Sequence, residues 1–229
     1  MSYVYRIKCR IREEGFFYTC KYIATVFYNG FNKLFEDIVL DLRYSRRFLN
    51  GNIKTPYKHL GANDTYHTDY SAMPIIFKQV NIVPEDVLVD VGCGKGRIIN
   101  YWISQALKNK IIGLELDPKI ADQTALQFKK YNNVSIIQGD AIEKLPEEGT
   151  VFYFYNPFSL EKVLEFEKKL FVLSQVKPVK VIYYNPKSIE VFDRSRWNIR
   201  YINFEKDLGM KRWGRLNKYH ELAIITSRN

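Results

Sequence analysis

Residues 87–97 read VLVDVGCGKGR, and this stretch decides the fold class. Its first five residues have the apolar, β-branched character of a buried strand. Glycines follow at alternate positions, Gly92, Gly94 and Gly96, and a helical stretch begins near Arg97. A strand, a glycine-rich turn and a helix in this order let the backbone approach a ligand at the carboxyl end of a parallel strand.

The chain that follows repeats the alternation of strand and helix. Four more apolar runs are IIGLEL (111–116), VSIIQG (134–139), VFYFYN (151–156) and KVIYYN (180–185). The stretches between them predict helices over 97–108, 118–131 and 160–175. This pattern indicates an α/β fold with a Rossmann-like, doubly wound and mainly parallel sheet. After Pro186 we expect a short helix at 188–194 and two closing strands, 197–204 and 220–226, as an antiparallel pair at the sheet edge.

The amino-terminal third has a different pattern. Apolar residues between positions 16 and 42 recur at three- and four-residue steps, which predicts an amphipathic helix that Gly30 divides in two. Its aromatic stripe favours packing against the sheet domain, with a membrane face as the alternative. Residues 44–70 predict a linker, and a short helix is expected at 73–79. We therefore divide the chain into a helical extension with its linker, 1–65, and a sheet domain, 66–229.

The glycine spacing identifies the ligand class. Dinucleotide sites use G-x-G-x-x-G, but here Arg97 stands at the position of the third glycine, so the pattern is G-x-G-x-G. S-adenosylmethionine has no phosphate, and its site uses such a turn to admit the amino acid moiety. We expect Gly92, Cys93, Gly94 and Gly96 to contact this cofactor and Asp90 to meet its ammonium group.

The next two strand ends extend the predicted cofactor site. Glu115 lies 25 positions after Asp90, near the spacing at which a carboxylate accepts both ribose hydroxyls. Leu116 would lie on the adenine face. Asp140 and the backbone of Ala141 would meet the amino edge of adenine. Three successive strand ends thus offer three contacts for one nucleoside.

These motifs together resemble the class I, seven-stranded, Rossmann-like S-adenosylmethionine-dependent methyltransferases over residues 66–226. DVGCGKGR, GLELDP and YNPF look more narrowly like a largely uncharacterised bacterial group of these enzymes. The segment HLGANDTYHTDY also resembles the region before the glycine loop of Dot1-type lysine methyltransferases. The resemblance implies a methyltransferase that needs S-adenosylmethionine and an acceptor.

The resemblance also places the methyl acceptor, without identifying it. Tyr155-Asn156-Pro157-Phe158 stands where amino-methylating relatives carry Asn/Asp-Pro-Pro-aromatic, so Asn156, Pro157 and Phe158 would hold an amine and adjoin the cofactor. The second proline is missing here, which favours a small molecule or a protein over a nucleic acid base. Three residues at the start of the sheet domain, ahead of its first strand, are candidates to cap the cofactor: Tyr66, Thr68 and Tyr70. His67 is a candidate general base.

Charge leaves a second functional class open. The net charge is +10, and residues 1–60 hold 11 Lys and Arg against 5 Asp and Glu, while residues 194–218 hold 8 against 2. Basic flanks favour an anionic partner, with Lys211, Arg212 and Arg215 as contact candidates. The alternative to an enzyme is therefore a non-catalytic module that binds nucleic acid or an anionic surface.

The remaining composition argues against several kinds of site. Cys9, Cys20 and Cys93 are too scattered for a disulfide framework or a zinc site, so no metal is expected. The sequence has no transmembrane-length apolar run and no secretory signal pattern, which predicts a cytoplasmic protein, with attachment at a membrane surface as the alternative. Nothing in the sequence predicts an oligomeric state.

Overall fold

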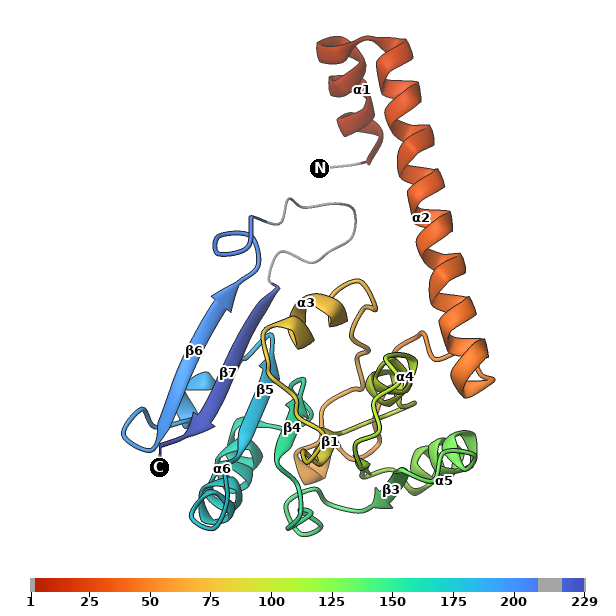
Figure 1. Ribbon diagram of the computed structural model, residues 1–229. Helices are drawn as coiled ribbons and strands as arrows, with labels where there is room; N and C mark the ends of the chain where they lie inside the picture. The colour runs from red at the N-terminus through yellow and green to blue at the C-terminus, as the bar shows by residue number, and fades with distance from the viewer. Residues whose placement is uncertain (1–2, 210–219, 229) are drawn as a thin grey trace.

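The computed structural model describes residues 3–209 and 220–228, and Figure 1 shows one sheet flanked by helices with a long helical hairpin projecting from it. The helices are α1 (Tyr3–Glu14), α2 (Phe16–Ser45), α3 (Met73–Lys78), α4 (Arg97–Ser104), α5 (Pro118–Phe128) and α6 (Leu160–Ser174), with 3-10 turns at Lys58–Leu60 and Ile189–Val191. The strands are β1 (Leu88–Val91), β2 (Ile111–Glu115), β3 (Val134–Gln138), β4 (Val151–Phe154), β5 (Lys180–Tyr184), β6 (Trp197–Asn203) and β7 (Glu221–Ser227).

The described strands form a seven-stranded sheet in the order β3-β2-β1-β4-β5-β7-β6. The first five are parallel, and β7 runs antiparallel to both β5 and β6. The predicted α/β class and the antiparallel closing pair are thus confirmed. Every residue of β1, β2 and β4 is buried, as expected for strands covered on both faces.

Two apolar cores cover the two faces of the sheet. One joins the strands to α3, α4 and the end of α5, with Trp102 at 0% exposure in its centre. The other packs α6 on the opposite face through Val163, Phe166 and Leu170. Because both faces are sealed, the carboxyl ends of the parallel strands are the place where a ligand can meet polar groups of the sheet.

Two predictions about helices are wrong. Gly30 does not divide the amino-terminal helix, because α2 continues through it for 30 residues. An isolated glycine costs a helix only about 1 kcal/mol, which neighbouring turns offset. The predicted helix at 188–194 is only the 3-10 turn Ile189–Val191.

The aromatic stripe of α2 does not pack on the sheet domain as expected. Phe27, Phe31 and Phe35 are 70%, 68% and 59% exposed. The helix joins the domain instead through its buried polar residues: Asp37 accepts from Arg97 of α4, and Asp41 accepts from the hydroxyl of Tyr70. The basic cluster of Lys211, Arg212 and Arg215 lies outside the described residues.

Candidate functional site

A pocket opens at the carboxyl ends of β1, β2 and β4, and the glycine turn forms its floor. Gly92, Gly94 and Gly96 all adopt positive φ, at 73°, 53° and 79°. At Gly92 an added Cβ would lie 2.7 Å from Pro157, and at Gly94 it would lie 2.7 Å from Thr65. The turn therefore needs glycine both for its backbone conformation and for close approach of neighbouring segments.

Asp90 ends β1 beneath this turn as a buried carboxyl group. It is 4% exposed, and burial, with a smaller contribution from Glu115, raises its pKa to about 8. An ionised carboxylate in such a place needs a cationic partner. The pocket therefore suits a positively charged group next to Asp90.

Glu115 lies at the end of β2 and ties the glycine turn to the neighbouring helix. Its carboxylate accepts hydrogen bonds from Gly94 N at 2.8 Å and Asp117 N at 2.9 Å, while burial raises its pKa. A carboxylate has about four acceptor positions, so two remain for a ligand's hydroxyl groups. Asp117 in turn caps α5 by accepting from Lys119 N and Ile120 N.

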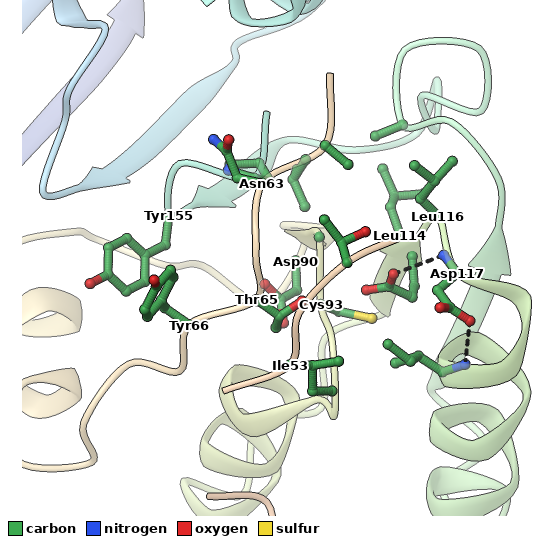
Figure 2. Close-up of a pocket in the computed structure, with 18 of the residues that line it drawn as sticks. Ile53, Asn63, Thr65, Tyr66, Asp90, Cys93, Leu114, Leu116, Asp117 and Tyr155 are labelled. Carbon is green, nitrogen blue, oxygen red and sulfur yellow. Dashed lines mark hydrogen bonds between the residues drawn. The ribbon is translucent and has the colours of Figure 1, made fainter. Parts of the chain in front are cut away.

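The third predicted strand end also reaches the pocket. Leu116, Asp140 and Ala141 line it together with Ile120 and Gly139. Asp140 accepts from Ile142 N at 2.8 Å, so its carboxylate also caps the following turn. Figure 2 shows Leu116 and Asp117 at one end of the pocket and Tyr66 and Tyr155 at the other, with Asp90 and Thr65 between.

The predicted linker forms a wall of this pocket, and only Tyr66, His67 and Thr68 of this wall were predicted from the sequence. Its lining residues lie between Leu49 and Thr68. Isolated β-bridges join Ile53 to Thr65 and Ala62 to Phe158. The only sequence signal was a set of turn residues, and such residues cannot show which distant segment a loop contacts.

Asn63 fixes this wall to the Asn-Pro-Phe loop. Its side-chain amide donates to the carbonyl oxygens of Asn156 and Phe158, at 3.0 and 2.7 Å, and its backbone N–H donates to Pro157 O at 2.9 Å. By family resemblance, the carbonyl oxygen of Pro157 would hold an acceptor amine. In this structure it accepts a hydrogen bond from the backbone of Asn63 in the chain's own linker.

The side chain of Asn156 is turned toward the sheet rather than the pocket. Its Oδ1 accepts from Tyr183 Oη at 2.8 Å and Lys187 N at 3.3 Å, and its Nδ2 donates to Asn185 O at 2.8 Å. Pro157 and Phe158 line the pocket, but Asn156 does not. The predicted direct contact of the Asn156 amide with an acceptor or cofactor therefore finds no support in this geometry.

The three capping candidates occupy different places. Tyr66 is 58% exposed at the pocket mouth, and Thr68 lines the pocket while sharing a 2.6 Å hydrogen bond with Tyr153 Oη. Tyr70 is buried outside the pocket lining, where its hydroxyl donates to Asp41 at 2.6 Å and accepts from Asn100 at 2.7 Å. Tyr70 thus joins α2 to α4 rather than capping a ligand.

Of the other residues predicted to contact the cofactor, Cys93 lines the pocket, whereas Gly94 and Gly96 do not. Cys93 lines the pocket as a buried residue, and burial raises the pKa of its thiol, which keeps it neutral. Gly94 and Gly96 shape the turn without lining the pocket. Within residues 3–209 and 220–228, no group of three or more His, Cys, Asp or Glu is placed to hold a metal ion.

These residues fit S-adenosylmethionine. The buried acid Asp90 suits a cationic group, a second acid has spare acceptor positions for hydroxyls, and the glycine turn leaves room for an amino acid moiety. The wall of residues 49–68 lines the pocket and would separate a bound nucleoside from bulk water.

Comparisons with known proteins agree with this geometry. A family model described as "Methyltransferase domain" matches residues 88–171. A probable cobalt-precorrin-6B C(15)-methyltransferase from Methanococcus maripaludis is 27% identical over 156 residues, covering 66% of this chain and 80% of that protein. The ribosomal RNA small subunit methyltransferase A of Thermotoga petrophila is 28% identical over 128 residues, covering 53% of this chain and 48% of that protein.

A solved structure shows the same fold. A methyltransferase from Pyrococcus furiosus matches with a TM-score of 0.54 at 14% identity, over 87% of this chain and 98% of that one. The resemblance to Dot1-type enzymes stays a prediction. The seven-stranded sheet, the methyltransferase-domain match over residues 88–171 and the methyltransferase relatives together support an S-adenosylmethionine-dependent methyltransferase activity for this chain.

Proposed function

We propose that this methyltransferase transfers its methyl group to an amine nitrogen of a small molecule or a protein. The observation that carries the proposal is the pocket mouth, where Tyr66 and Tyr155 lie together (Figure 2) and both line the pocket. Aromatic faces suit a cationic amine. Asn156 would contribute through the loop that it holds in place, not through its amide.

The contacts that we propose for the cofactor follow from the positions of the two buried carboxyl groups. Asp90 would pair with the ammonium group and Glu115 with the ribose hydroxyls, while Leu116 and Ala141 would border adenine. Tyr66 and Thr68 would close the pocket over the nucleoside. When bound, S-adenosylmethionine would supply a methyl group on a positively charged sulfur. The lone pair of the acceptor nitrogen would bond to the methyl carbon as the carbon–sulfur bond breaks, which leaves S-adenosylhomocysteine.

A protonated amine must lose its proton before it can attack. His67 lines the pocket and lies 3.8 Å from Asp69, and its pKa is lowered by burial and by the charge of Arg97. The imidazole is therefore neutral near pH 7 and able to accept that proton. The rest of the rate would come from positioning within a pocket screened from water.

Radiolabel transfer tests the acceptor class. The protein is incubated with methyl-tritiated S-adenosylmethionine and with the small-molecule, protein and RNA fractions of a bacterial extract. We expect base-stable label in the small-molecule or protein fraction, and none with Glu115→Ala. Label confined to RNA would contradict the amine proposal and favour an activity like that of the ribosomal RNA methyltransferase relative. Label on carbon in a tetrapyrrole fraction would favour the precorrin enzyme instead.

We place this activity in the cytoplasm, with the basic amino-terminal flank available to an anionic surface. No helix in the described part of the chain is long and apolar enough to cross a bilayer.

A further inference from the structure

Arg97 is a buried cation that the fold does not fully partner. It is 4% exposed, begins α4 immediately after the glycine turn and lines the pocket. Its Nη2 donates to Asp37 at 2.6 Å, and its guanidinium carbon lies 4.2 Å above the ring of Tyr70. Its Nε and Nη1 are buried and have no partner among the described residues. Buried guanidinium donors are rarely left in this state.

The position of these donors defines a ligand class. They lie at the amino-terminal end of α4, where the partial positive charge of the helix favours an anion. Asp90, on the strand that enters the same turn, suits a cation. The turn thus has an acid before it and, after it, a base with two free donors, an arrangement that complements a zwitterionic amino acid.

We propose that Arg97 binds the carboxylate of the cofactor's amino acid moiety, with Asp37 of α2 holding the guanidinium in place. This inference rests on the proposed cofactor site. A guanidinium holds its donors in a fixed plane, so the free Nε or Nη1 can donate to a carboxylate oxygen in a set direction, which a lysine does not reproduce. Asp37 would then act as a positioning residue contributed by the helical extension.

Matched ligands test the proposal on the unmodified protein. S-adenosylhomocysteine is compared by calorimetry with its decarboxylated analogue, which keeps the nucleoside, the thioether and the amine. We expect the analogue to bind about ten- to a hundredfold more weakly, since hydrogen bonds to charged groups are lost. Equal binding of the two ligands would overturn the inference while leaving the cofactor site intact. Binding of neither would overturn the proposed cofactor site, and this inference with it.

Variants then assign the effect to Arg97. Arg97→Met should bring the two affinities to within about threefold of each other, by weakening only the carboxylated ligand. Lys95→Met is the matched control, since Lys95 also lines the pocket but its Nζ already donates to Asn50 O at 2.9 Å. It should keep the preference of the unmodified protein. A full preference in Arg97→Met, or its loss in Lys95→Met alone, would contradict the assignment.

A second, independent observation concerns the exposed stripe of α2. Phe27, Phe31, Phe35 and Val39 follow one another at four-residue steps, so they share one face of the helix. Phe17 extends the stripe to the hairpin tip at 87% exposure. Asp37 and Asp41 lie on a different face, which meets α4. Figure 1 shows α1 and α2 projecting together beyond the sheet domain.

The charge of the hairpin indicates whether a second copy of the chain or a lipid surface covers the exposed stripe of α2. Residues 3–30 hold five Lys and Arg against two Glu. Over the whole hairpin, residues 3–45, seven Lys and Arg stand against five Asp and Glu, but two of these acids, Asp37 and Asp41, are buried. The exposed surface of the hairpin is therefore basic, and an anionic lipid surface complements it better than a second basic copy does. We infer that α1 and α2 lie on an anionic bilayer, with the aromatic stripe in the interface and the basic side chains at the headgroups.

Vesicle sedimentation tests this surface. The full chain is mixed with phosphatidylcholine vesicles with and without phosphatidylserine. We expect about tenfold or stronger preference for the anionic vesicles, and loss of binding in a Phe31→Glu, Phe35→Glu double variant. Leu126→Glu is the control, because Leu126 is 73% exposed on α5 and is not part of the stripe. Retained S-adenosylhomocysteine binding verifies that each variant is folded.

Two results would overturn the membrane inference. One is equal binding of the double variant and the unmodified protein to anionic vesicles. The other is a dimer in light scattering that the double variant converts to a monomer, since a second copy would then cover the stripe.

Discussion

Asp90 shows how burial of a single carboxyl group prepares it for a cation. With its pKa raised to about 8, most of this group is protonated at neutral pH. Between its ordinary pKa and this raised value, the folded protein holds a proton that the unfolded chain releases. The ligand-free protein therefore loses stability as pH rises through that window, and an ammonium partner removes the penalty.

This predicts a pH-dependent affinity. Between pH 6 and 7.5, S-adenosylhomocysteine should bind about tenfold more tightly for each unit of rising pH, because binding requires ionised Asp90. Asp90→Asn should bind weakly and without this dependence. Calorimetry in buffers of different ionisation heat should also show about one proton released at pH 7 by the unmodified protein. A pH-independent affinity would show that Asp90 does not meet the ammonium group.

Gly96 is constrained by space as well as by its backbone. An added Cβ there would lie 2.4 Å from the ring of Phe128, at a φ of 79°. We expect Gly96→Ala to lower the free energy of unfolding by about 2–4 kcal/mol, from strain and overpacking together. Gly15→Ala is the control, since Gly15 has a φ of 87° but no neighbour within 4 Å. Because the ψ of Gly15 is 159°, its backbone conformation is one that side chains rarely adopt, and urea denaturation should give a loss of about 1–3 kcal/mol from backbone strain alone.

Tyr70 tests the distinction between a structural and a ligand-binding residue. Tyr70→Phe removes the hydroxyl shared by Asp41 and Asn100, which should cost about 1–3 kcal/mol of stability. Affinity for S-adenosylhomocysteine in the folded variant should change less than about twofold, because Tyr70 does not line the pocket. A large affinity loss without a stability loss would restore Tyr70 to the cofactor site.

At the scale of single elements, α2 is the helix whose course could not be predicted from its sequence. Gly30 reads as a break, yet it lies within the helix with no neighbour within 4 Å of an added Cβ. Gly30→Ala should therefore raise the free energy of unfolding by about 0.5–1 kcal/mol, measured by urea denaturation. Destabilisation would mean that this position needs glycine for a contact.

The strand ends show what local pattern can predict. Asp90, Glu115 and Asp140 were identified from their positions after apolar runs, and Asp90 and Glu115 lie in paired parallel strands. Strand pairing brings such residues together whatever the loops do. Asn63 could not be identified in this way, because its role depends on contact with the Asn-Pro-Phe loop 93 residues away.

At the scale of the whole molecule, the alternation of strands and helices determined the sheet, but the pocket depends on parts outside it. Arg97 is held by Asp37, 60 residues earlier in the chain, and Leu49 N donates to Asp41 at the start of the pocket wall. Periodicity reports burial within one element and carries no information on such long-range polar contacts.

Ligand binding should consequently stabilise the whole domain. At a hundredfold excess over its dissociation constant, S-adenosylhomocysteine should raise the free energy of unfolding by about 2.7 kcal/mol, which corresponds to about 5–10 °C in Tm. Differential scanning fluorimetry measures this shift. Glu115→Ala should abolish it, and an unchanged shift in that variant would contradict the proposed ribose contact.

The wall of residues 49–68 also has a kinetic consequence. It crosses the carboxyl ends of the strands and is attached at Asn63 to the loop that would border the acceptor. A spent nucleoside must then leave either past the acceptor or by detachment of this wall. An acceptor that occupies the mouth would therefore lengthen the residence of the product behind it.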